Sequence, residues 1–487
     1  MPRITKLTPI QIYRLLPKTN CKACGEESCM AFAIKLLNLQ TSIEKCKPLV
    51  EDPKYRKNYE ELKKLLKPAI REVTIGKGEK SVKIGGEYVM HRHELTFMRK
   101  TVIAVTIEDT MKQETIDARL DLDKKFRFEY LDKVLTLDAI AIKYSSGDPE
   151  RFVKVFEYVR SRINKPLIVV SLHPKVYEKL GDLLKEERPL IYAATRENWH
   201  IISDYAKKFE CPITVLHEGD PRYLISLANA IRKRGVEDIC IDPGAMPSCL
   251  GYAVKTATTF RWLACNEDCE LVGYPIVTST VPIWMSNLDY NMKLIMEACL
   301  ASVLIIRYAS LLIMYSPEAV TYLPVTVLRE NYYSDPRRPT TIQPGLKEIG
   351  KPNELSPVLV TCNYALTYSI VTSDLEKGKV DAYLLVIDTE GYAVDVSVAA
   401  DKFRPEKIAE LIKETGIENK VKHRYLVIPG KAAKLAGSIE EATGWKVIVG
   451  PIDSSDLPNF IEKQWKKIIE SLQSGSSSQE GSQTGQS

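Results

Sequence analysis

The chain has 487 residues, a length that predicts about three domains with sizeable cores. Hydrophobic residues make up 45% of it and charged residues 27%, a balance that excludes a fibrous, collagenous or wholly disordered protein. The formal net charge is only +5 and no run of basic residues forms a stripe, so we expect no nucleic-acid partner.

The N-terminal segment MPRITKLTPI lacks the apolar core of a secretory signal, which predicts a cytoplasmic protein. The most apolar stretch, residues 295–315, contains Glu297 and Arg307, and charges at mid-span are costly in lipid. It therefore predicts a buried helix followed by a buried strand, and no membrane association. In a cytoplasmic protein the eleven cysteines do not indicate a disulfide framework.

Residues 1–60 are predicted to form a domain around four cysteines spaced C-x2-C-x4-C-x16-C, namely Cys21, Cys24, Cys29 and Cys46. Thiolates at this spacing can converge on one iron–sulfur centre, and Gly25 lets the backbone bend close to it. Structural zinc also takes four thiolates, but it commonly uses paired C-x2-C units, and the second pair is missing here. The spacing therefore favours one 4Fe–4S cluster, with zinc as the alternative.

Residues 61–98 are predicted to form a connector, with a charged helix and then a small hairpin in TIGKGEKSVKIGG. In residues 99–330, short apolar runs alternate with segments of helical period, which predicts parallel strands buried on both faces. Eight such units fit a TIM (β/α)8 barrel better than an open doubly wound sheet. The runs begin at Thr101, Leu137, Pro166, Pro189, Pro212, Asp238 and Leu271, and the eighth at Val303 or Ala319.

Residues 331–356 are dense in Pro and Gly and are predicted to form a linker. Residues 357–470 show a second α/β pattern, with strands predicted in PVLVTCN, AYLLVIDTEG, YAVDVSVAA, RYLVIPG and WKVIVGP. The tail, residues 471–487, is rich in Ser, Gln and Gly and is predicted to be disordered.

The segment NCKACGEESCMAFA is similar to the N-terminal cluster motif of the large (gamma) subunit of the corrinoid iron–sulfur protein of the acetyl-CoA decarbonylase/synthase complex. The chain resembles this family to about residue 465, through REVTIGKGEKSVKIGG, MHRHELTF, LPVTVLRENYYSDPRRP, PGLKEIG, PVLVTCNYALTYSIV and GWKVIVGPIDSSDLPNF. One departure is Lys47, which stands where the family usually has Pro directly after the last cluster ligand.

The resemblance implies a methyltransferase subunit that carries a methyl group on cobalt. The group comes from a methyl-tetrahydropterin, of the tetrahydrosarcinapterin or tetrahydrofolate type. It passes to the nickel–iron–sulfur centre of acetyl-CoA synthase, in acetyl-CoA synthesis or cleavage. The implied partners are the small (delta) subunit, as a heterodimer, and the acetyl-CoA synthase and carbon monoxide dehydrogenase subunits.

The resemblance also implies that residues 357–470 bind the corrinoid, a cobamide held against the delta subunit. The implied contacts are Thr361, Thr367, Gly391, Tyr392, Ala393, Val394, Gly450 and Pro451. By themselves, Thr361 and Thr367 could merely cap a helix, and Gly391 could merely make a hairpin turn. None of the six histidines lies in a D-x-H-x-x-G motif, which predicts a corrinoid without protein histidine on cobalt.

Two other functions stay open. Asp242 ends a predicted barrel strand, where catalytic residues of this fold usually lie. Its carboxylate could hold a pterin ring. The chain would then be a methyltransferase acting through its own barrel, although Asp-Pro-Gly is also a plain turn sequence. The other alternative is an electron-transfer or assembly subunit without corrinoid.

Two further residue pairs resemble sites but are interpreted as structural. His91 and His93 are predicted to point to opposite faces of a strand, which favours packing. Cys265 and Cys269 form C-x3-C with no further Cys or His close in sequence, so we expect buried or redox-silent thiols.

Overall fold

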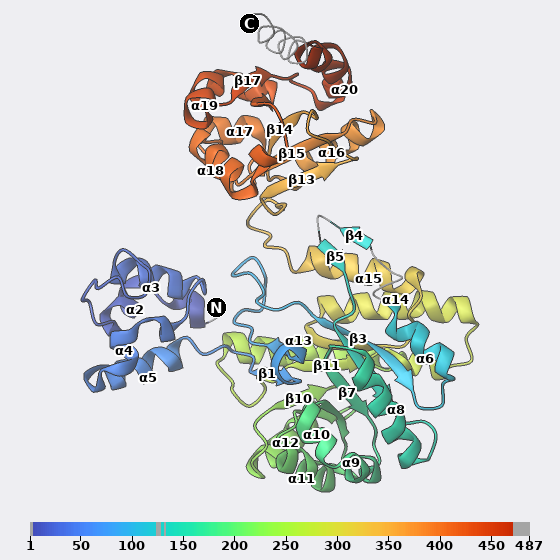
Figure 1. Ribbon diagram of the computed structural model, residues 1–487. Coiled ribbons are helices and arrows are strands. Elements are labelled where there is room, and N and C mark those ends of the chain that lie inside the picture. Colours follow the sequence, from blue (N-terminus) through green and yellow to red (C-terminus); the bar gives the residue numbers. More distant parts are fainter. Residues whose placement is uncertain (1–2, 123–127, 131–132, 471–487) are drawn as a thin grey trace, which may run out of the picture. The chain divides into compact units, whose positions relative to one another are not determined.

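The computed structural model describes residues 3–122, 128–130 and 133–470 (Figure 1). The chain divides into two compact units. Unit 1 comprises Met1–Phe128 and Val134–Asp335, and unit 2 comprises Glu129–Lys133 and Pro336–Ser487. The predicted disordered tail lies outside the described residues.

Unit 1 begins with a small helical module. Its main helices are α2 (Pro9–Leu15), α3 (Cys29–Leu37), α4 (Lys47–Glu51) and α5 (Arg56–Leu65). Thr8 and Gln11 form a reciprocal capping box at the start of α2, and the Ser28 hydroxyl accepts the Ala31 N–H at the start of α3. The helices enclose a core of their own, built from Ile12, Phe32, Leu36, Leu49 and Leu62.

The predicted hairpin is formed by β1 (Glu72–Ile75) and β2 (Val82–Gly85), which pair antiparallel. Its Val73, Ile75 and Ile84 side chains belong to the apolar cluster inside the barrel. The Gly76 N–H donates to the Arg188 carbonyl, just before a barrel strand begins. The hairpin therefore closes the N-terminal end of the barrel.

The barrel is closed and its eight strands run parallel, which confirms the predicted TIM-barrel architecture. In their order around the barrel, the strands are β3 (Val102–Glu108), β6 (Ala139–Lys143), β7 (Leu167–Val170), β8 (Leu190–Ala194), β9 (Ile213–Leu216), β10 (Ile239–Asp242), β11 (Ile276–Ser279) and β12 (Ala309–Met314).

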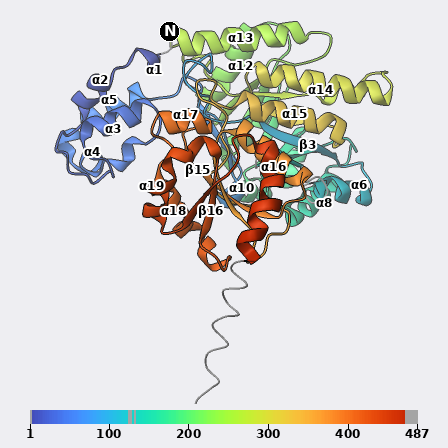
Figure 2. The same ribbon diagram turned by 90° about the horizontal axis from the view of Figure 1, so that it is seen from above.

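Helices surround the barrel between its strands (Figures 1 and 2). They are α6 (Gln113–Leu120), α8 (Pro149–Arg162), α9 (Pro174–Leu180), α10 (Asp182–Glu187), α11 (Trp199–Phe209), α12 (Pro221–Lys233), α13 (Leu250–Asn266), α14 (Tyr290–Ile306) and α15 (Ala319–Tyr332). Three of them start at an aspartate whose carboxylate accepts a backbone N–H of the first turn, at Asp148, Asp220 and Asp289.

The eighth strand is neither of the two predicted runs. The run from Val303 belongs to the end of α14, where Leu304 and Ile305 continue its buried stripe. The run from Ala319 forms α15 and contains Pro324, which a central strand would not accommodate. The strand between them is β12, preceded by Tyr308 in a left-handed conformation (φ 73°).

Unit 2 is an α/β sheet with the strand order β13-β15-β14-β16-β17. The parallel strands are β14 (Val358–Cys362), β15 (Ala382–Ile387), β16 (Tyr425–Ile428) and β17 (Lys446–Val449), and β13 (Gly345–Ile349) pairs antiparallel with β15. The main helices are α16 (Ala365–Lys377), α17 (Val394–Ala399), α18 (Pro405–Thr415), α19 (Ala436–Thr443) and α20 (Leu457–Phe460).

Two predictions for this part of the chain are corrected. The segment YAVDVSVAA is not a strand, because α17 buries Val394 and Ser397 at helical spacing despite its three valines. The predicted linker 331–356 is not uniformly irregular, because its residues 345–349 form β13. Among the described residues, no helix is both long and apolar enough to cross a membrane.

Candidate functional site

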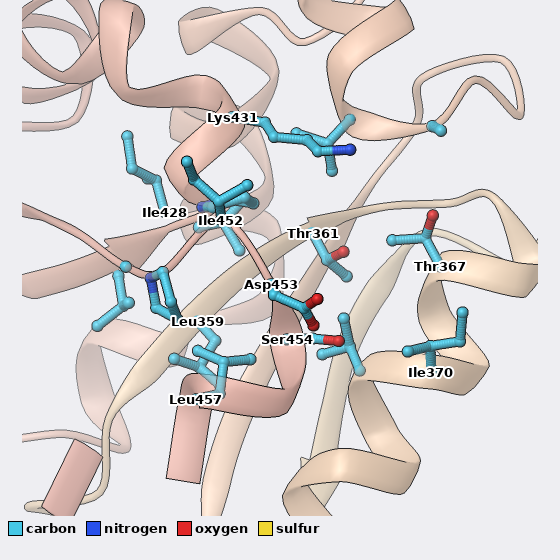
Figure 3. A pocket seen from close by; sticks show the side chains of 18 of the residues that line it. Leu359, Thr361, Thr367, Ile370, Ile428, Lys431, Ile452, Asp453, Ser454 and Leu457 are labelled. Atoms are coloured by element: carbon cyan, nitrogen blue, oxygen red, sulfur yellow. The ribbon is translucent and has the colours of Figure 1, made fainter. Parts of the chain in front are cut away.

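A cavity of about 460 Å³ lies at the carboxyl ends of the parallel strands of unit 2 (Figure 3). Thr361, at the end of β14, and Thr367 and Ile370, on α16, line one side. The segments that follow β16 and β17 supply the other side, with Lys431 and Ile452. This edge is where α/β sheets gather their ligands.

Six of the eight predicted corrinoid contacts line this cavity. They are Thr361, Thr367, Ala393, Val394, Gly450 and Pro451. Gly391 and Tyr392 are not among the lining residues. The structure therefore gathers at one place residues that are separated by up to 90 positions in sequence.

The Thr361 side chain is a buried polar group in the wall of the cavity. The residue is 2% exposed, and its hydroxyl forms no hydrogen bond within the described part of the chain. Leaving a buried hydroxyl without a partner costs about 1–3 kcal/mol. Since the hydroxyl belongs to a residue lining the cavity, a polar group of a bound molecule could satisfy it.

Gly391 has a conformational role in a loop beside the cavity. Its φ of 82° favours glycine, and an added Cβ would lie 2.8 Å from Thr341 Cγ2. The loop is organised by Asn363, whose Oδ1 accepts the N–H groups of Thr389 and Gly391 at 3.0 Å each. It connects β15 to α17, not two strands as predicted. Sequence reasoning missed Asn363, although its place directly after a strand was a signal.

The cavity also has a charged and apolar rim that sequence reasoning missed. Lys431 Nζ lies 3.1 Å from Asp395 Oδ2, and the amine lowers the pKa of that carboxyl. Four exposed apolar residues of the rim segments lie at Leu366, Ile370, Val396 and Ile452. The sequence could have indicated this rim through Pro-Gly-Lys after β16, because proline and glycine mark the end of a strand.

Two glycines hold the β16 and β17 loops together. The Gly430 N–H donates to the Pro451 carbonyl at 3.0 Å, and the Gly450 N–H donates to the Ile428 carbonyl at 2.8 Å. A Cβ on Gly430 would lie 2.8 Å from the Gly450 carbonyl oxygen, which is backbone and cannot move aside cheaply. The shape of this side of the cavity therefore depends on Gly430.

His423, the histidine of this unit, lies away from the cavity lining. It is buried, its Nε2 lies 2.9 Å from the Ser356 carbonyl, and its Nδ1 accepts the Tyr425 N–H at 3.3 Å. Burial lowers its pKa below the ordinary value. Both ring nitrogens are thus engaged by the protein backbone.

The four cysteines of the N-terminal module differ in exposure. Cys29 and Cys46 are buried, Cys24 is partly buried and Cys21 is exposed. Burial raises the pKa of the Cys46 thiol, and the other three thiols raise it further, so all four are near enough to interact electrostatically. The Ala23 N–H and the Thr19 hydroxyl lower the pKa of Cys21.

The loop before α3 has the tight curvature that a cluster-binding loop needs. Lys18, Asn20 and Lys22 have positive φ, as does Gly25. The Asn20 carboxamide oxygen accepts the Cys29 N–H at 2.8 Å, which fixes the loop to the start of α3. Within the described ranges, however, no three or more Cys, His, Asp or Glu side chains are arranged closely enough to hold a metal ion.

In the barrel, Asp242 lies at the carboxyl end of β10 and is buried. It accepts the Tyr192 hydroxyl at 2.7 Å and the Gly244 N–H at 2.8 Å. Burial raises its pKa to about 6. Its carboxylate is satisfied by the chain itself, as expected of a turn-forming aspartate.

The structure also tests the predictions for the histidine pair and for the second cysteine pair. His91 and His93 lie in a turn, not on opposite faces of a strand, and their rings stack 5.5 Å apart. The turn is closed by the Glu94 N–H, which donates to the His91 carbonyl. Cys265 is buried, and this raises its pKa to about 11, whereas Cys269 is partly exposed.

Comparisons with known proteins match nearly the whole chain. A family model described as "CO dehydrogenase/acetyl-CoA synthase delta subunit" matches residues 72–461, and one described as "Putative Fe-S cluster" matches residues 16–48. The acetyl-CoA decarbonylase/synthase complex subunit gamma of Archaeoglobus fulgidus is 42% identical over 94% of this chain and 98% of its own. That of Methanopyrus kandleri is 41% identical over 96% of this chain and 100% of its own.

Among solved structures, dihydropteroate synthase from Xanthomonas albilineans aligns with 48% of this chain and 94% of its own, at 16% identity and a TM-score of 0.35.

Proposed function

Since the chain belongs to the family of the gamma subunit of the acetyl-CoA decarbonylase/synthase complex, we propose that it is a corrinoid and iron–sulfur methyl carrier. In this role it takes a methyl group from a methyl-tetrahydropterin and passes it to the nickel–iron–sulfur centre of acetyl-CoA synthase. When bound, the corrinoid supplies the cobalt atom that holds the methyl group in transit. The observation that carries the proposal is the cavity of unit 2 with its unpartnered Thr361 hydroxyl.

The residues of the cavity fit a corrinoid in their chemistry. A corrin ring is largely apolar and is edged with amide side chains, which need hydrogen-bond partners. The cavity offers aliphatic walls, including Leu359 and Ile370, together with the hydroxyls of Thr361 and Thr367. The Thr361 hydroxyl can donate to an amide oxygen or accept from an amide nitrogen, which would remove its burial cost.

The size of the cavity supports a partner-covered ligand. A volume of about 460 Å³ suits a drug-sized molecule, and a cobamide is much larger. Part of the ligand would therefore stand outside, against the exposed apolar rim formed by Leu366, Ile370, Val396 and Ile452. We place the delta subunit over that exposed part, so that the heterodimer holds the cobamide more tightly than this chain alone.

No histidine of unit 2 is available at the cavity within the described residues. His423 is held by Ser356 and Tyr425 and is surrounded by Trp445 and Trp465. This supports a corrinoid bound without protein histidine on cobalt. A weak lower ligand suits a carrier that must both accept and release a methyl group.

For the N-terminal module, we propose that Cys21, Cys24, Cys29 and Cys46 hold one 4Fe–4S cluster. The match of residues 16–48 to an iron–sulfur family model supports this assignment, and the thiols would have to lie closer together than they do in the described ranges to hold the cluster. Such a cluster supplies electrons that restore the reduced corrinoid after accidental oxidation. The remaining proposed partners are the carbon monoxide dehydrogenase and acetyl-CoA synthase subunits.

The test begins with the full chain purified without oxygen, alone and with the delta subunit. We expect about four irons per chain, and cobamide binding that strengthens when the delta subunit is added. Stoichiometric zinc without iron would contradict the cluster assignment. Absence of cobamide binding in both samples would instead favour an electron-transfer or assembly subunit, and methyl-tetrahydropterin binding by the isolated chain would favour a barrel methyltransferase.

A matched pair of variants isolates the Thr361 hydroxyl. Thr361→Val should weaken cobamide binding while raising the free energy of unfolding by about 1 kcal/mol, because a buried unpaired hydroxyl is removed. Thr278→Val removes another buried unpartnered hydroxyl, on β11 in the barrel, and should stabilise the chain without affecting cobamide. Equal cobamide affinity in both variants would contradict a contact at Thr361.

A further inference from the structure

The N-terminal module differs in charge from the rest of the chain. Residues 1–65 contain 13 lysine and arginine residues against seven aspartate and glutamate residues, a formal charge of +6. Since the whole chain carries only +5, the rest of it has a net charge of −1. A positive charge of this size on one small module attracts negatively charged partners.

Part of this charge lies beside the first and the last of the four cluster cysteines. Four exposed lysines stand within three positions of Cys21 or Cys46 in sequence, namely Lys18, Lys22, Lys45 and Lys47. In the described part of the chain, none of these four has a carboxylate at ion-pair distance, whereas Lys35 of the same module pairs with Glu26 at 2.8 Å. The four ammonium groups are therefore available to the carboxylates of a partner.

Cys21 is the cluster cysteine that a partner can approach most closely. It is exposed, whereas Cys24 is partly buried and Cys29 and Cys46 are buried. Helix α3 covers the buried side, because Cys29 begins this helix and belongs to the core of the module. A protein that exchanges electrons with a cluster in this module would therefore approach at Cys21, next to Lys22.

The residue types on this surface favour a protein partner over a nucleic acid or a lipid headgroup. All four cations are lysines, whereas arginine is the residue of choice for the bidentate recognition of phosphate. Uncharged side chains are also exposed here. Ala23 follows Lys22, and Val50, which is 46% exposed, lies one helical turn after Lys47 on the same side of α4. Apolar contacts bordered by charged residues are typical of protein interfaces.

We infer that the lysine face, formed by Lys18, Lys22, Lys45 and Lys47 around Cys21, docks an acidic one-electron carrier protein. The inference rests on the proposed function, in which a cluster of this module restores the reduced corrinoid. The cluster loses an electron at each such event, so it needs an external donor. The carrier is oxidised by one electron and the cluster is reduced by one, and no bond is formed or broken. Opposite charges accelerate the encounter of two proteins.

The test uses the full chain purified without oxygen and flavodoxin as the probe, since flavodoxin is an acidic one-electron carrier. Binding of oxidised flavodoxin is measured by titration calorimetry, which does not depend on reduction potentials. We expect Lys22→Glu and Lys47→Glu each to weaken binding about tenfold, and to make it less sensitive to salt, because like charges would face each other. Lys255→Glu is the matched control, since Lys255 is an exposed lysine on barrel helix α13.

Lys47→Pro removes one charge with little risk to the fold. Lys47 is the first residue of α4, a position that proline favours, and it stands where the family usually has proline. We expect this variant to bind flavodoxin more weakly than the parent but more tightly than Lys47→Glu, and Lys47→Arg to bind like the parent.

Three results would overturn the inference. The first is equal affinity of Lys22→Glu and Lys255→Glu for flavodoxin. The second is a parent chain that contains iron but does not bind flavodoxin. The third is displacement of flavodoxin by a duplex oligonucleotide or by anionic lipid vesicles at about 0.15 M salt, which would assign the lysine face to a nucleic acid or a membrane. A parent chain without iron would instead contradict the proposed cluster, so the two failures are distinguishable.

Discussion

At the scale of a single residue, Asp242 lies at a barrel strand end, where catalytic residues usually lie, and we interpret it as structural. Its two hydrogen bonds come from Tyr192 and Gly244, so each carboxylate oxygen has one donor from the chain itself. Burial dominates its electrostatics and raises its pKa to about 6. The folded protein therefore pays an ionisation penalty at neutral pH that a neutral side chain would avoid.

Asp242→Asn tests this interpretation through pH. Because the folded-state pKa lies above the unfolded value, the carboxylate costs stability above pH 4, and the cost is fully developed above pH 6. A pKa rise from 3.8 to about 6 corresponds to about 3 kcal/mol. We expect Asp242→Asn to be more stable than the parent at pH 8 by up to that amount, and the gain to shrink toward pH 4. Urea unfolding at both pH values measures this.

The same variant addresses the alternative in which the barrel performs the methyl transfer itself. A structural aspartate predicts unchanged methyl transfer by the reconstituted complex. A loss of methyl-tetrahydropterin binding in Asp242→Asn, with no stability gain at pH 8, would show instead that the carboxylate serves a ligand.

At the scale of elements, the side of the cavity formed by the β16 and β17 loops depends on close backbone contact. Gly430→Ala would place a methyl group 2.8 Å from the Gly450 carbonyl oxygen and push the loops apart. We expect a loss of about 1–3 kcal/mol in the free energy of unfolding and weaker cobamide binding, measured by thermal unfolding and titration.

Gly437→Ala is the control for that substitution. Gly437 lies in α19, and nothing lies within 4 Å of a Cβ at this position. Alanine in a helix interior should raise stability by about 0.5–1 kcal/mol and leave cobamide binding unchanged. If the two alanine variants behaved alike, contact between the loops would not shape the cavity.

The elements that sequence predicted correctly are those whose signal is local. Seven barrel strands and four strands of unit 2 follow from short β-branched runs between helical segments. Two of the errors arose where tertiary contacts determine the secondary structure. Residues 394–399 are rich in valine yet form α17, because Val394 and Ser397 turn toward the sheet. The end of α14 looked like a strand because both of its faces are apolar.

The candidate site also combines residues that have a local sequence signal with contacts that only the fold creates. The cysteine spacing, Thr361 at the end of β14 and Thr367 on the following helix can be identified from sequence. The ion pair between Lys431 and Asp395 joins positions 36 residues apart, and the missing partner of Thr361 depends on every neighbouring side chain. Neither can be inferred without the folded backbone.

At the scale of the whole molecule, the chain passes between the two compact units around residues 128–134 and again after α15, in a short segment of the predicted linker. The chain is bonded into unit 2 from Thr340 onward, since its carbonyl accepts the Ala365 N–H and the Ile342 N–H donates to Asn363. Limited trypsin digestion should therefore cut between residues 333 and 339, at the Arg337–Arg338 bond, and spare β13. Mass spectrometry of the fragments identifies the site. Cleavage within residues 345–349 would contradict the assignment of β13 to the sheet.

The short connection limits how far unit 2, which contains the cavity, can move from the end of α15. Seven residues, 333–339, separate the end of α15 from Thr340, whose carbonyl accepts the Ala365 N–H of unit 2. Fully extended, they reach at most about 25 Å. In the proposed function, a methyl group bound at the cavity of unit 2 could not travel farther than this connection allows between its donor and its acceptor. In that function, the proteins that donate and accept the methyl group must bind within this distance of α15, one after the other. Their order of binding, and not the motion of unit 2, would then set the rate of methyl transfer.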